Sequence, residues 1–232
     1  MEEKKKRKRR RSATTQESVT LKHLANKAGV SIATVSLVLR DSSLITEETK
    51  KRVLAAIEET GYIYNRGAAR LRTNKSNIVG LLMNDIRTPF LMEIAVHLES
   101  LFYEENKVLL LGNSEERLEK QEIHINLLRE YGVEGILLTP VVRTPPELLR
   151  QLNLSRAPTI CVARYVEGAQ SDYVAPDNIQ GVRLAVRYLA SLGHRRIAYL
   201  GGLHGSSTAL DRLKGYLAGL DDVGLAPSEE LL

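Results

Sequence analysis

The sequence contains one cysteine, Cys161, which excludes a disulfide within the chain and is typical of proteins from a reducing compartment. No apolar run approaches the roughly 20 residues that are needed to cross a bilayer. No apolar segment follows the N-terminal charges, as it would in a secretory signal. These absences predict a soluble, cytoplasmic protein that has no membrane partner.

The chain also lacks the sequence patterns of enzymes and metal proteins. Its five histidines are scattered without the spacing of metal ligands: His23, His97, His124, His194 and His204. The glycine-rich residues 200–206 lie between an expected strand and an expected helix, but they lack the G-x-G-x-x-G spacing and no G-K-[ST] follows. We therefore expect no catalytic activity, no cofactor and no bound metal.

Charge is distributed unevenly along the 232 residues, a length that suggests a small domain joined to a larger one. Residues 1–75 contain 18 Lys or Arg and 8 Asp or Glu, a net charge of +10. Residues 76–232 contain 15 and 20, a net charge of −5. A basic front on an acidic remainder predicts a head that binds a polyanion and a body that does not.

Residues 20–39 have the pattern of two short helices joined by a tight turn. Thr20 can cap the first helix, Gly29 can end it in the left-handed region, and Ser31 can cap the second helix. Apolar side chains recur at helical spacing on both segments: Leu21, Leu24, Ala25, Ala28, Val35, Val38 and Leu39. Such a helix-turn-helix can place the N-terminal turn of its second helix in the major groove of DNA.

A third helix is expected to begin at Thr46 and to end at Gly61, and the residues expected on its buried face are Val53, Leu54, Ala56 and Ile57. Three helices predict a compact headpiece over residues 19–63.

The headpiece is preceded by a tail, residues 1–18, that contains eight consecutive basic residues, Lys4 to Arg11, and is expected to be disordered. The tail can add salt-dependent phosphate contacts or can merely aid nonspecific association, and neither role includes reading bases.

From Asn77 onward, strand-like and helix-like segments alternate. The expected strands are residues 78–83, 107–111, 135–139, 159–162, 173–175 and 197–200, and the expected helices are residues 90–105, 115–131, 145–152, 178–192 and 207–220. This succession predicts a parallel sheet flanked by helices. We assign residues 77–162 to a first α/β lobe and residues 163–232 to part of a second α/β lobe.

Five motifs resemble, in order and spacing, the lactose repressor and galactose repressor family of bacterial transcription regulators: VTLKHLANKAGVSIATVSLVL, EETKKRVLAAIEETGY, IVGLL, NDIRTPF and GHRRIAYLGG. The resemblance covers the chain from Val19 onward. It implies an all-α helix-turn-helix headpiece, a hinge helix and linker in residues 64–76, and an α/β body like that of periplasmic sugar-binding proteins. The body of this family is longer, so we expect the second lobe to be incomplete.

The resemblance implies a sequence-specific DNA-binding transcription regulator, a repressor that binds a near-palindromic operator in double-stranded DNA as a homodimer. A small-molecule effector, a sugar or similar compound, is expected between the lobes. Because the second lobe is expected to be incomplete, binding of this effector is expected to be weak or absent. A transported-sugar-binding protein would share the body but would carry a secretory signal and no basic head. The remaining alternative is a fragment that binds DNA nonspecifically through its tail.

The resemblance also assigns DNA contacts residue by residue. The phosphate or positioning contacts are Thr20, Ser31, Thr34 and Tyr62, the base-reading positions are Ile32, Ala33 and Leu37, and further contacts fall at Lys22, Ser36 and Arg40. The family usually has a polar or basic side chain in the base-reading trio. Because all three are apolar here, they can contact thymine methyl groups but cannot make a bidentate guanine contact, which predicts an A·T-leaning half-site.

Hinge contacts are assigned to Asn65, Ala68 and Leu71, and Leu71 matches the leucine that the family inserts between base pairs. An inserted apolar side chain unstacks a base step and bends the duplex. Tyr64 stands where the family often has proline, and Gly67 lowers helix propensity by about 1 kcal/mol relative to alanine, so this hinge is harder to order.

Effector-binding residues are expected in loops beyond the carboxyl ends of the strands. Asp85 and Phe90 follow the first strand, and Asp177 follows a later one, where it can instead simply cap the next helix. Arg212 matches the arginine with which many relatives hold a sugar hydroxyl or an anionic group, and a surface or ion-paired arginine is the alternative.

Overall fold

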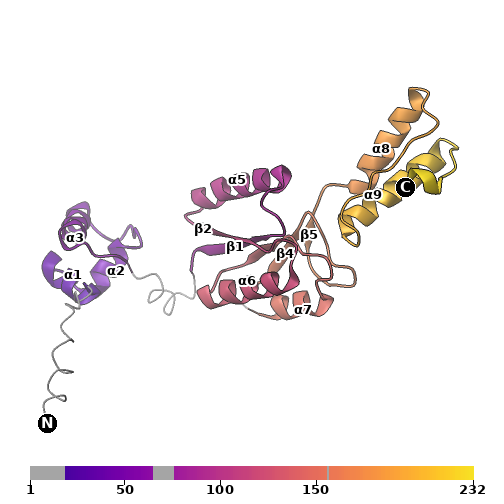
Figure 1. Cartoon of the computed structure of the whole chain (residues 1–232). Helices are drawn as coiled ribbons and strands as arrows, with labels where there is room; N and C mark the ends of the chain where they lie inside the picture. Colours follow the sequence, from indigo (N-terminus) through magenta and orange to yellow (C-terminus); the bar gives the residue numbers. More distant parts are fainter. Residues whose placement is uncertain (1–18, 65–75, 156) are drawn as a thin grey trace, which may run out of the picture. The chain divides into compact units, whose positions relative to one another are not determined.

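The computed structural model describes residues 19–64, 76–155 and 157–232 (Figure 1). The chain divides into two compact units, residues 1–73 and residues 74–232. The basic tail and the predicted hinge contacts Asn65, Ala68 and Leu71 lie outside the described residues.

The first unit contains the helices α1 (Leu21–Ala28), α2 (Ile32–Val38) and α3 (Glu47–Thr60), as the sequence predicts. Their ends are set locally. The side chains of Thr20, Ser31 and Thr46 each accept a hydrogen bond from the backbone three residues later, and Gly29 and Gly61 end α1 and α3 with φ of 63° and 62°. Left-handed positions of this kind favour glycine because it has no Cβ.

One small core holds the three helices together. Leu24, Val35 and Val53, one from each helix, are fully buried. Tyr62 packs against the same cluster and retains only 8% of its exposure. A core of this size makes the unit only marginally stable, so the helix caps contribute a large share of its stability.

The second unit contains a five-stranded, all-parallel sheet in the order β2-β1-β3-β4-β5. Its strands are β1 (Ile78–Met83), β2 (Val108–Asn113), β3 (Ile136–Leu138), β4 (Thr159–Val162) and β5 (Tyr173–Val174). The helices are α5 (Pro89–Glu104), α6 (Leu118–Tyr131), α7 (Pro146–Leu154), α8 (Asn178–Ser191) and α9 (Ser207–Asp222), followed by the 3-10 helix η1 (Glu229–Leu231). The predicted parallel sheet flanked by helices is confirmed.

Both faces of this sheet are covered: α5 lies on one face, and α6 and α7 lie on the other (Figure 1). Alternate residues of β1 point to opposite faces. Leu81 and Met83 therefore pack with Leu91 of α5, whereas Leu82 packs with Ile125 of α6. The carboxyl ends of the strands stay uncovered by these helices, which leaves them available to form a site.

The prediction of a strand at residues 197–200 is wrong, because the structure has no regular secondary structure there. A strand needs a neighbour with which to form a hydrogen-bond ladder, and none lies beside it among the described residues. Ile197 instead packs against α8 and α9, and its carbonyl accepts a 2.9 Å hydrogen bond from the Tyr216 hydroxyl. The pairing of β5 with β4 also places Tyr173 and Val174 in the first sheet, whereas the sequence grouped them with the second lobe.

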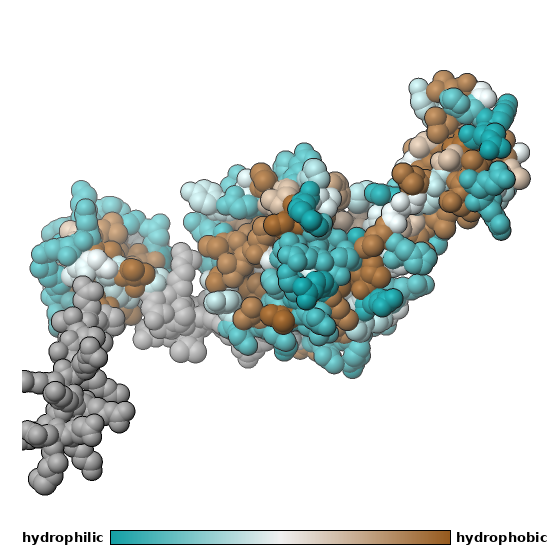
Figure 2. Space-filling view, viewed as in Figure 1, coloured by the Kyte–Doolittle hydropathy of each residue, from teal (hydrophilic) through white to brown (hydrophobic). Residues whose placement is uncertain are grey.

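Helices α8 and α9 pack tightly against each other yet keep exposed apolar side chains, seen as brown surface over this pair in Figure 2. Two of these side chains lie on α8, Leu184 (52% exposed) and Tyr188 (65% exposed). A third, Leu192 at the C-terminal end of this helix, is 59% exposed. None of the helices in the described parts of the chain has the length and apolar character of a membrane span.

Candidate functional site

The N-terminal turn of α2 is exposed. Ile32 is 42% exposed, Ala33 is exposed, and Val35 on the opposite face is fully buried. The Ser31 hydroxyl caps this turn by accepting from the Thr34 amide at 3.1 Å, and it lies 2.9 Å from the Thr34 hydroxyl. The cap holds a small apolar surface, flanked by two hydroxyls, at the end of the helix where backbone amides favour anions such as phosphate.

The C-terminal end of α2 carries a positive charge. Arg40 Nε donates to the Ser36 carbonyl at 3.0 Å, and Arg40 Nη2 donates to the Ser36 hydroxyl at 3.3 Å. Ser36 and Leu37 are half-buried, and Thr20 and Lys22 are exposed at the start of α1. Of the residues that are predicted to contact DNA and that the structure describes, only Tyr62 is a buried member of the headpiece core.

A second candidate site lies in the body. The loops after β1, β3 and β4 and the start of α9 surround a cavity of about 270 Å³, whose lining includes Asn84, Phe90, Thr139, Arg164, Asn178 and Arg212. Its position beyond the carboxyl ends of parallel strands is the one at which open α/β sheets bind ligands.

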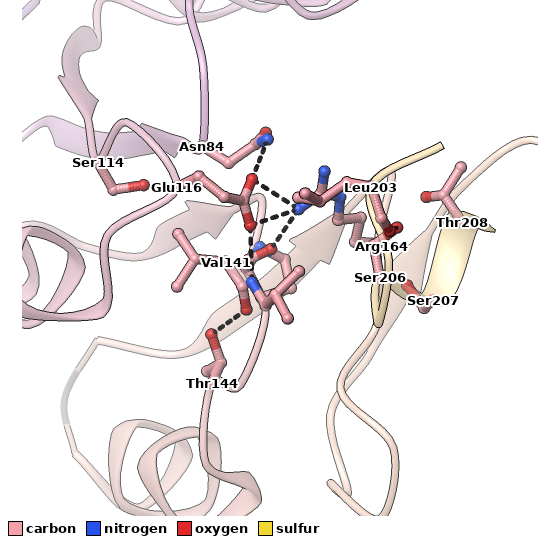
Figure 3. A network of polar contacts seen from close by, with 12 residues as sticks. Asn84, Ser114, Glu116, Val141, Thr144, Arg164, Leu203, Ser206, Ser207 and Thr208 are labelled. Carbon is pink, nitrogen blue, oxygen red and sulfur yellow. Dashed lines mark hydrogen bonds and ion pairs between the residues drawn. The ribbon is translucent and has the colours of Figure 1, made fainter. Parts of the chain in front are cut away.

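A polar network centred on Glu116 lies next to the cavity (Figure 3). Glu116 Oε2 accepts from Asn84 Nδ2 at 2.8 Å, and Glu116 Oε1 accepts from the Val142 amide at 2.7 Å. Arg164 Nη1 donates to both carboxylate oxygens, at 2.9 and 3.0 Å, and to the Pro140 carbonyl at 3.3 Å. Because Arg164 and Glu116 are only 15% and 25% exposed, this ion pair is screened less than a surface pair.

Glu116 reaches the network through an uncommon backbone conformation. Glu115 and Glu116 have φ of 51° and 57°, in the left-handed region that non-glycine residues rarely adopt. Each such residue costs of order 1–3 kcal/mol, which the surrounding contacts must offset. The Glu116 amide donates to the Asn84 carbonyl at 2.9 Å, so both its backbone and its side chain are bonded to Asn84.

Two buried polar atoms of the cavity lining have no hydrogen-bond partner within the described residues: Asn84 Oδ1 and Thr139 Oγ1. Asn84 and Thr139 are 6% and 1% exposed. Buried polar groups are nearly always bonded, so these two oxygens need a hydrogen-bond partner from outside the described residues, which can be water or a ligand.

The lining also includes Arg212, whose Nε donates to Asn178 Oδ1 at 3.0 Å. This bond orients the guanidinium and leaves its other donors for a ligand. Phe90, which is 46% exposed, supplies an apolar surface to the same cavity. The described residues contain no group of three or more His, Cys, Asp or Glu side chains that could hold a metal ion.

The four residues predicted for effector binding divide into two pairs. Phe90 and Arg212 line the cavity, whereas Asp85 and Asp177 do not. Asp85 pairs with Arg87, at 2.9 Å, and the hydrogen bond from this guanidinium lowers the pKa of the Asp85 carboxyl. Asp177 caps α8 by accepting from the Gln180 amide at 2.9 Å.

The sequence interpretation missed Glu116, Thr139 and Arg164. Thr139 directly follows β3 and Arg164 lies two residues beyond β4, so a search of every strand end would have found both. No sequence signal points to Glu116, because its partners lie 32 and 48 residues away in the chain.

Each of the two units of the chain matches a known protein family. Residues 20–65 match the family described as bacterial regulatory proteins, lacI family, and residues 76–232 match periplasmic binding proteins and sugar binding domain of LacI family. The maltose regulon regulatory protein MalI of Escherichia coli (strain K12) is 35% identical over 211 residues, which are 91% of this chain and 62% of that protein. The ribose operon repressor of Bacillus subtilis (strain 168) is 35% identical over 198 residues, 85% of this chain and 59% of that protein.

Solved structures show the same fold. The lac repressor dimer bound to operator and the anti-inducer ONPF has a TM-score of 0.78 at 24% identity, covering 91% of this chain and 64% of that one. The complex of the transcriptional regulator CelR with cellobiose has a TM-score of 0.60 at 29% identity, covering 92% and 64%. The chain thus spans a little under two thirds of the length of the relatives that it matches.

Proposed function

Because this chain belongs to the lacI family of bacterial regulatory proteins, we propose that it is a sequence-specific DNA-binding transcription regulator, a repressor that acts in the cytoplasm. It binds a near-palindromic operator as a homodimer, so that the two-fold axis of the protein matches two half-sites. The observation that carries the proposal is the capped, exposed first turn of α2, which is small enough to enter the major groove.

In this proposal the DNA contacts fall into three groups. Ile32, Ala33 and Leu37 contact base edges, Leu71 wedges into the minor groove together with Asn65 and Ala68, and the positioning contacts come from Thr20, Lys22, Ser31, Thr34, Ser36, Arg40 and the hydroxyl end of Tyr62. The exposed apolar side chain of Ile32 supports a preference for thymine methyl groups over guanine. Part of the specificity then comes from the deformability of the operator rather than from base contacts.

The body is proposed to sense a small molecule, a sugar or a compound of similar polarity, in the cavity that Phe90 and Arg212 line. The two unpartnered oxygens of Asn84 and Thr139 in this cavity support ligand binding. An effector changes operator affinity only to the extent that it binds one conformation of the protein better than another. Asp85 and Asp177 act indirectly in this scheme, by shaping the loop after β1 and the start of α8.

The decisive experiment is selection of bound oligonucleotides from a randomised library, with the 232-residue chain and with a variant that lacks residues 1–18. We expect a palindromic, A·T-leaning consensus that survives removal of the tail. Binding that disappears with the tail, or that shows no consensus, would instead identify a nonspecific DNA-binding fragment. Titration with salt separates the two, because the tail contributes phosphate contacts alone.

A further inference from the structure

The orientation of the Asn84 side-chain amide is determined by its neighbour. Asn84 Nδ2 lies 2.8 Å from Glu116 Oε2. A carboxylate can only accept hydrogen bonds, so the atom of Asn84 that faces Glu116 must be the nitrogen. The amide oxygen is therefore the atom that does not bond to Glu116, and it is left without a donor among the described residues.

Glu116 cannot easily turn away from Asn84. Its other contacts, from the Val142 amide at 2.7 Å and from Arg164 Nη1 at 2.9 and 3.0 Å, hold the carboxylate from two further sides. These partners come from the loops after β3 and β4, while Asn84 directly follows β1. One carboxylate thus ties together the three strand ends that surround the cavity.

The result is a cavity wall with a defined polarity. Asn84 Oδ1 is a pure acceptor, and it is buried in a residue that is 6% exposed. Thr139 Oγ1, also buried and unpartnered, lines the same cavity and can adapt as donor or acceptor. A ligand that presents only acceptors to this wall, such as a keto, ether or fluoro group, leaves the Asn84 oxygen unsatisfied.

We propose that Glu116 is a specificity-determining positioning residue, which makes the cavity select a small polyhydroxy ligand with a hydroxyl group that donates to Asn84 Oδ1. This inference rests on the proposed effector role of the cavity. The hydroxyl donor is required on the Asn84 side, while Arg212, with donors only, takes an oxygen acceptor of the same ligand.

The test uses the 232-residue chain and isothermal calorimetry with neutral hexoses at millimolar concentration. The hexose that binds best is then replaced by each of its monodeoxyfluoro analogues, since fluorine can accept a hydrogen bond weakly but cannot donate one. In the unmodified protein we expect one ring position at which fluorine weakens binding about tenfold or more, the cost of an unsatisfied buried acceptor.

Glu116→Gln is expected to abolish this penalty specifically. The glutamine amide can donate to Asn84, so the Asn84 amide can rotate and present its nitrogen to the cavity. The loss of affinity that fluorine causes at the sensitive ring position then falls below about threefold. The order of affinities among the analogues fluorinated at the other positions stays the same. A merely structural role of Glu116 would weaken all analogues alike, and that outcome overturns the proposal.

Glu115→Gln is the matched control. Glu115 has the same left-handed backbone and also carries an ion pair, to Lys120 at 2.7 Å, but it lies outside the cavity lining. It must retain the full position-specific penalty. If Glu116→Gln does not fold, Asn84→Ala provides the second test, because it removes the acceptor while leaving Glu116 paired with Arg164, and it must also lose the penalty.

Two further outcomes overturn the inference: no hexose binds the unmodified chain, or all fluoro analogues bind equally well. The proposed function is judged separately by oligonucleotide selection with the same preparation. A chain that selects an operator but binds no hexose refutes only the ligand assignment. A chain that shows the fluoro pattern without any operator preference refutes only the DNA-binding proposal.

Discussion

The Tyr165 hydroxyl donates to Asp211 Oδ1 at 2.9 Å, which joins the segment after β4 to helix α9 across 46 residues of sequence. The Tyr165 amide also donates to the Ser207 hydroxyl at 3.1 Å, so this tyrosine is bonded to α9 through both backbone and side chain. Burial, followed by the bond to Asp211, raises the pKa of Tyr165 from 10.0 to about 12.

Tyr165→Phe tests this connection through its pH dependence. The raised pKa means that folding favours the neutral phenol, so its contribution to stability is complete below pH 10.0 and is lost as the pH rises through about 12. We expect the variant to be less stable than the parent near neutral pH, by about 0.5–1.5 kcal/mol for the hydrogen bond, and the difference to shrink above pH 10.0. Urea unfolding at a series of pH values measures it. Tyr131→Phe, at a side chain that is 63% exposed, is the control that should change nothing.

The contact between α8 and α9 depends on the absence of a side chain at Gly215. A Cβ there would lie 2.3 Å from the Ile179 carbonyl oxygen, which is backbone and cannot move aside alone. Gly215→Ala is therefore expected to lower the free energy of unfolding by about 1–3 kcal/mol. Gly181→Ala on α8 meets nothing within 4 Å and should raise it, by up to about 1 kcal/mol, through helix propensity. Thermal unfolding measures both variants. If the two substitutions change the stability in the same direction, this account of the packing is wrong.

Leu37→Arg tests the reading face of α2. An arginine there can make the bidentate contact to guanine that leucine cannot, so selected oligonucleotides should gain one guanine per half-site, with about 1–3 kcal/mol of discrimination against other bases. Leu54→Arg adds the same charge on α3. The sequence placed Leu54 on the buried face of this helix, which is wrong, because its side chain is 50% exposed. This control should raise affinity for all sequences without a new base preference. Equal consensus sequences for Leu37→Arg and the parent would show that position 37 does not face the bases.

Ser31→Ala removes the cap of α2, and Thr46→Ala removes the matching cap of α3. The Ser31 hydroxyl accepts a hydrogen bond from the Thr34 amide at 3.1 Å, and the Thr46 hydroxyl accepts one from the Thr49 amide at 3.4 Å. Both substitutions are expected to cost about 0.5–2 kcal/mol of headpiece stability in urea unfolding. Only Ser31→Ala should also weaken operator binding under conditions in which both variants are folded. A loss of DNA affinity that merely follows stability in both variants would remove Ser31 from the proposed contacts.

Much of the headpiece could be predicted because its determinants are local. A capping hydroxyl acts on an amide three residues away, and a glycine ends a helix through its own φ, so Thr20, Gly29 and Ser31 specify the boundaries of α1 and α2 without reference to the rest of the chain. The strands β1 and β4 were predictable for a related reason, since buried parallel strands are short continuous apolar runs.

The strand prediction at residues 197–200 was wrong because strand formation does not depend on local sequence alone. The sequence there is apolar enough for a strand, but strand formation depends on a hydrogen-bonded neighbour that periodicity does not report. Residue type and position likewise do not report that the carboxylates of Asp85 and Asp177 are bonded within the protein, to Arg87 and to the Gln180 amide. The effector role of these two residues stays a prediction.

The amino-acid sequence by itself determined the helix-turn-helix with its capped and apolar second helix, the alternation that produces a parallel sheet, and the general place of a ligand site beyond the strand ends. Only the tertiary structure decided which side chains form that site. Glu116 meets Asn84 and Arg164 across 32 and 48 residues, and the free Asn84 oxygen exists only because those three side chains converge. Short-range hydrogen bonds and periodicity are properties of a segment, whereas the polarity of a cavity wall is a property of the packing that brings distant segments together.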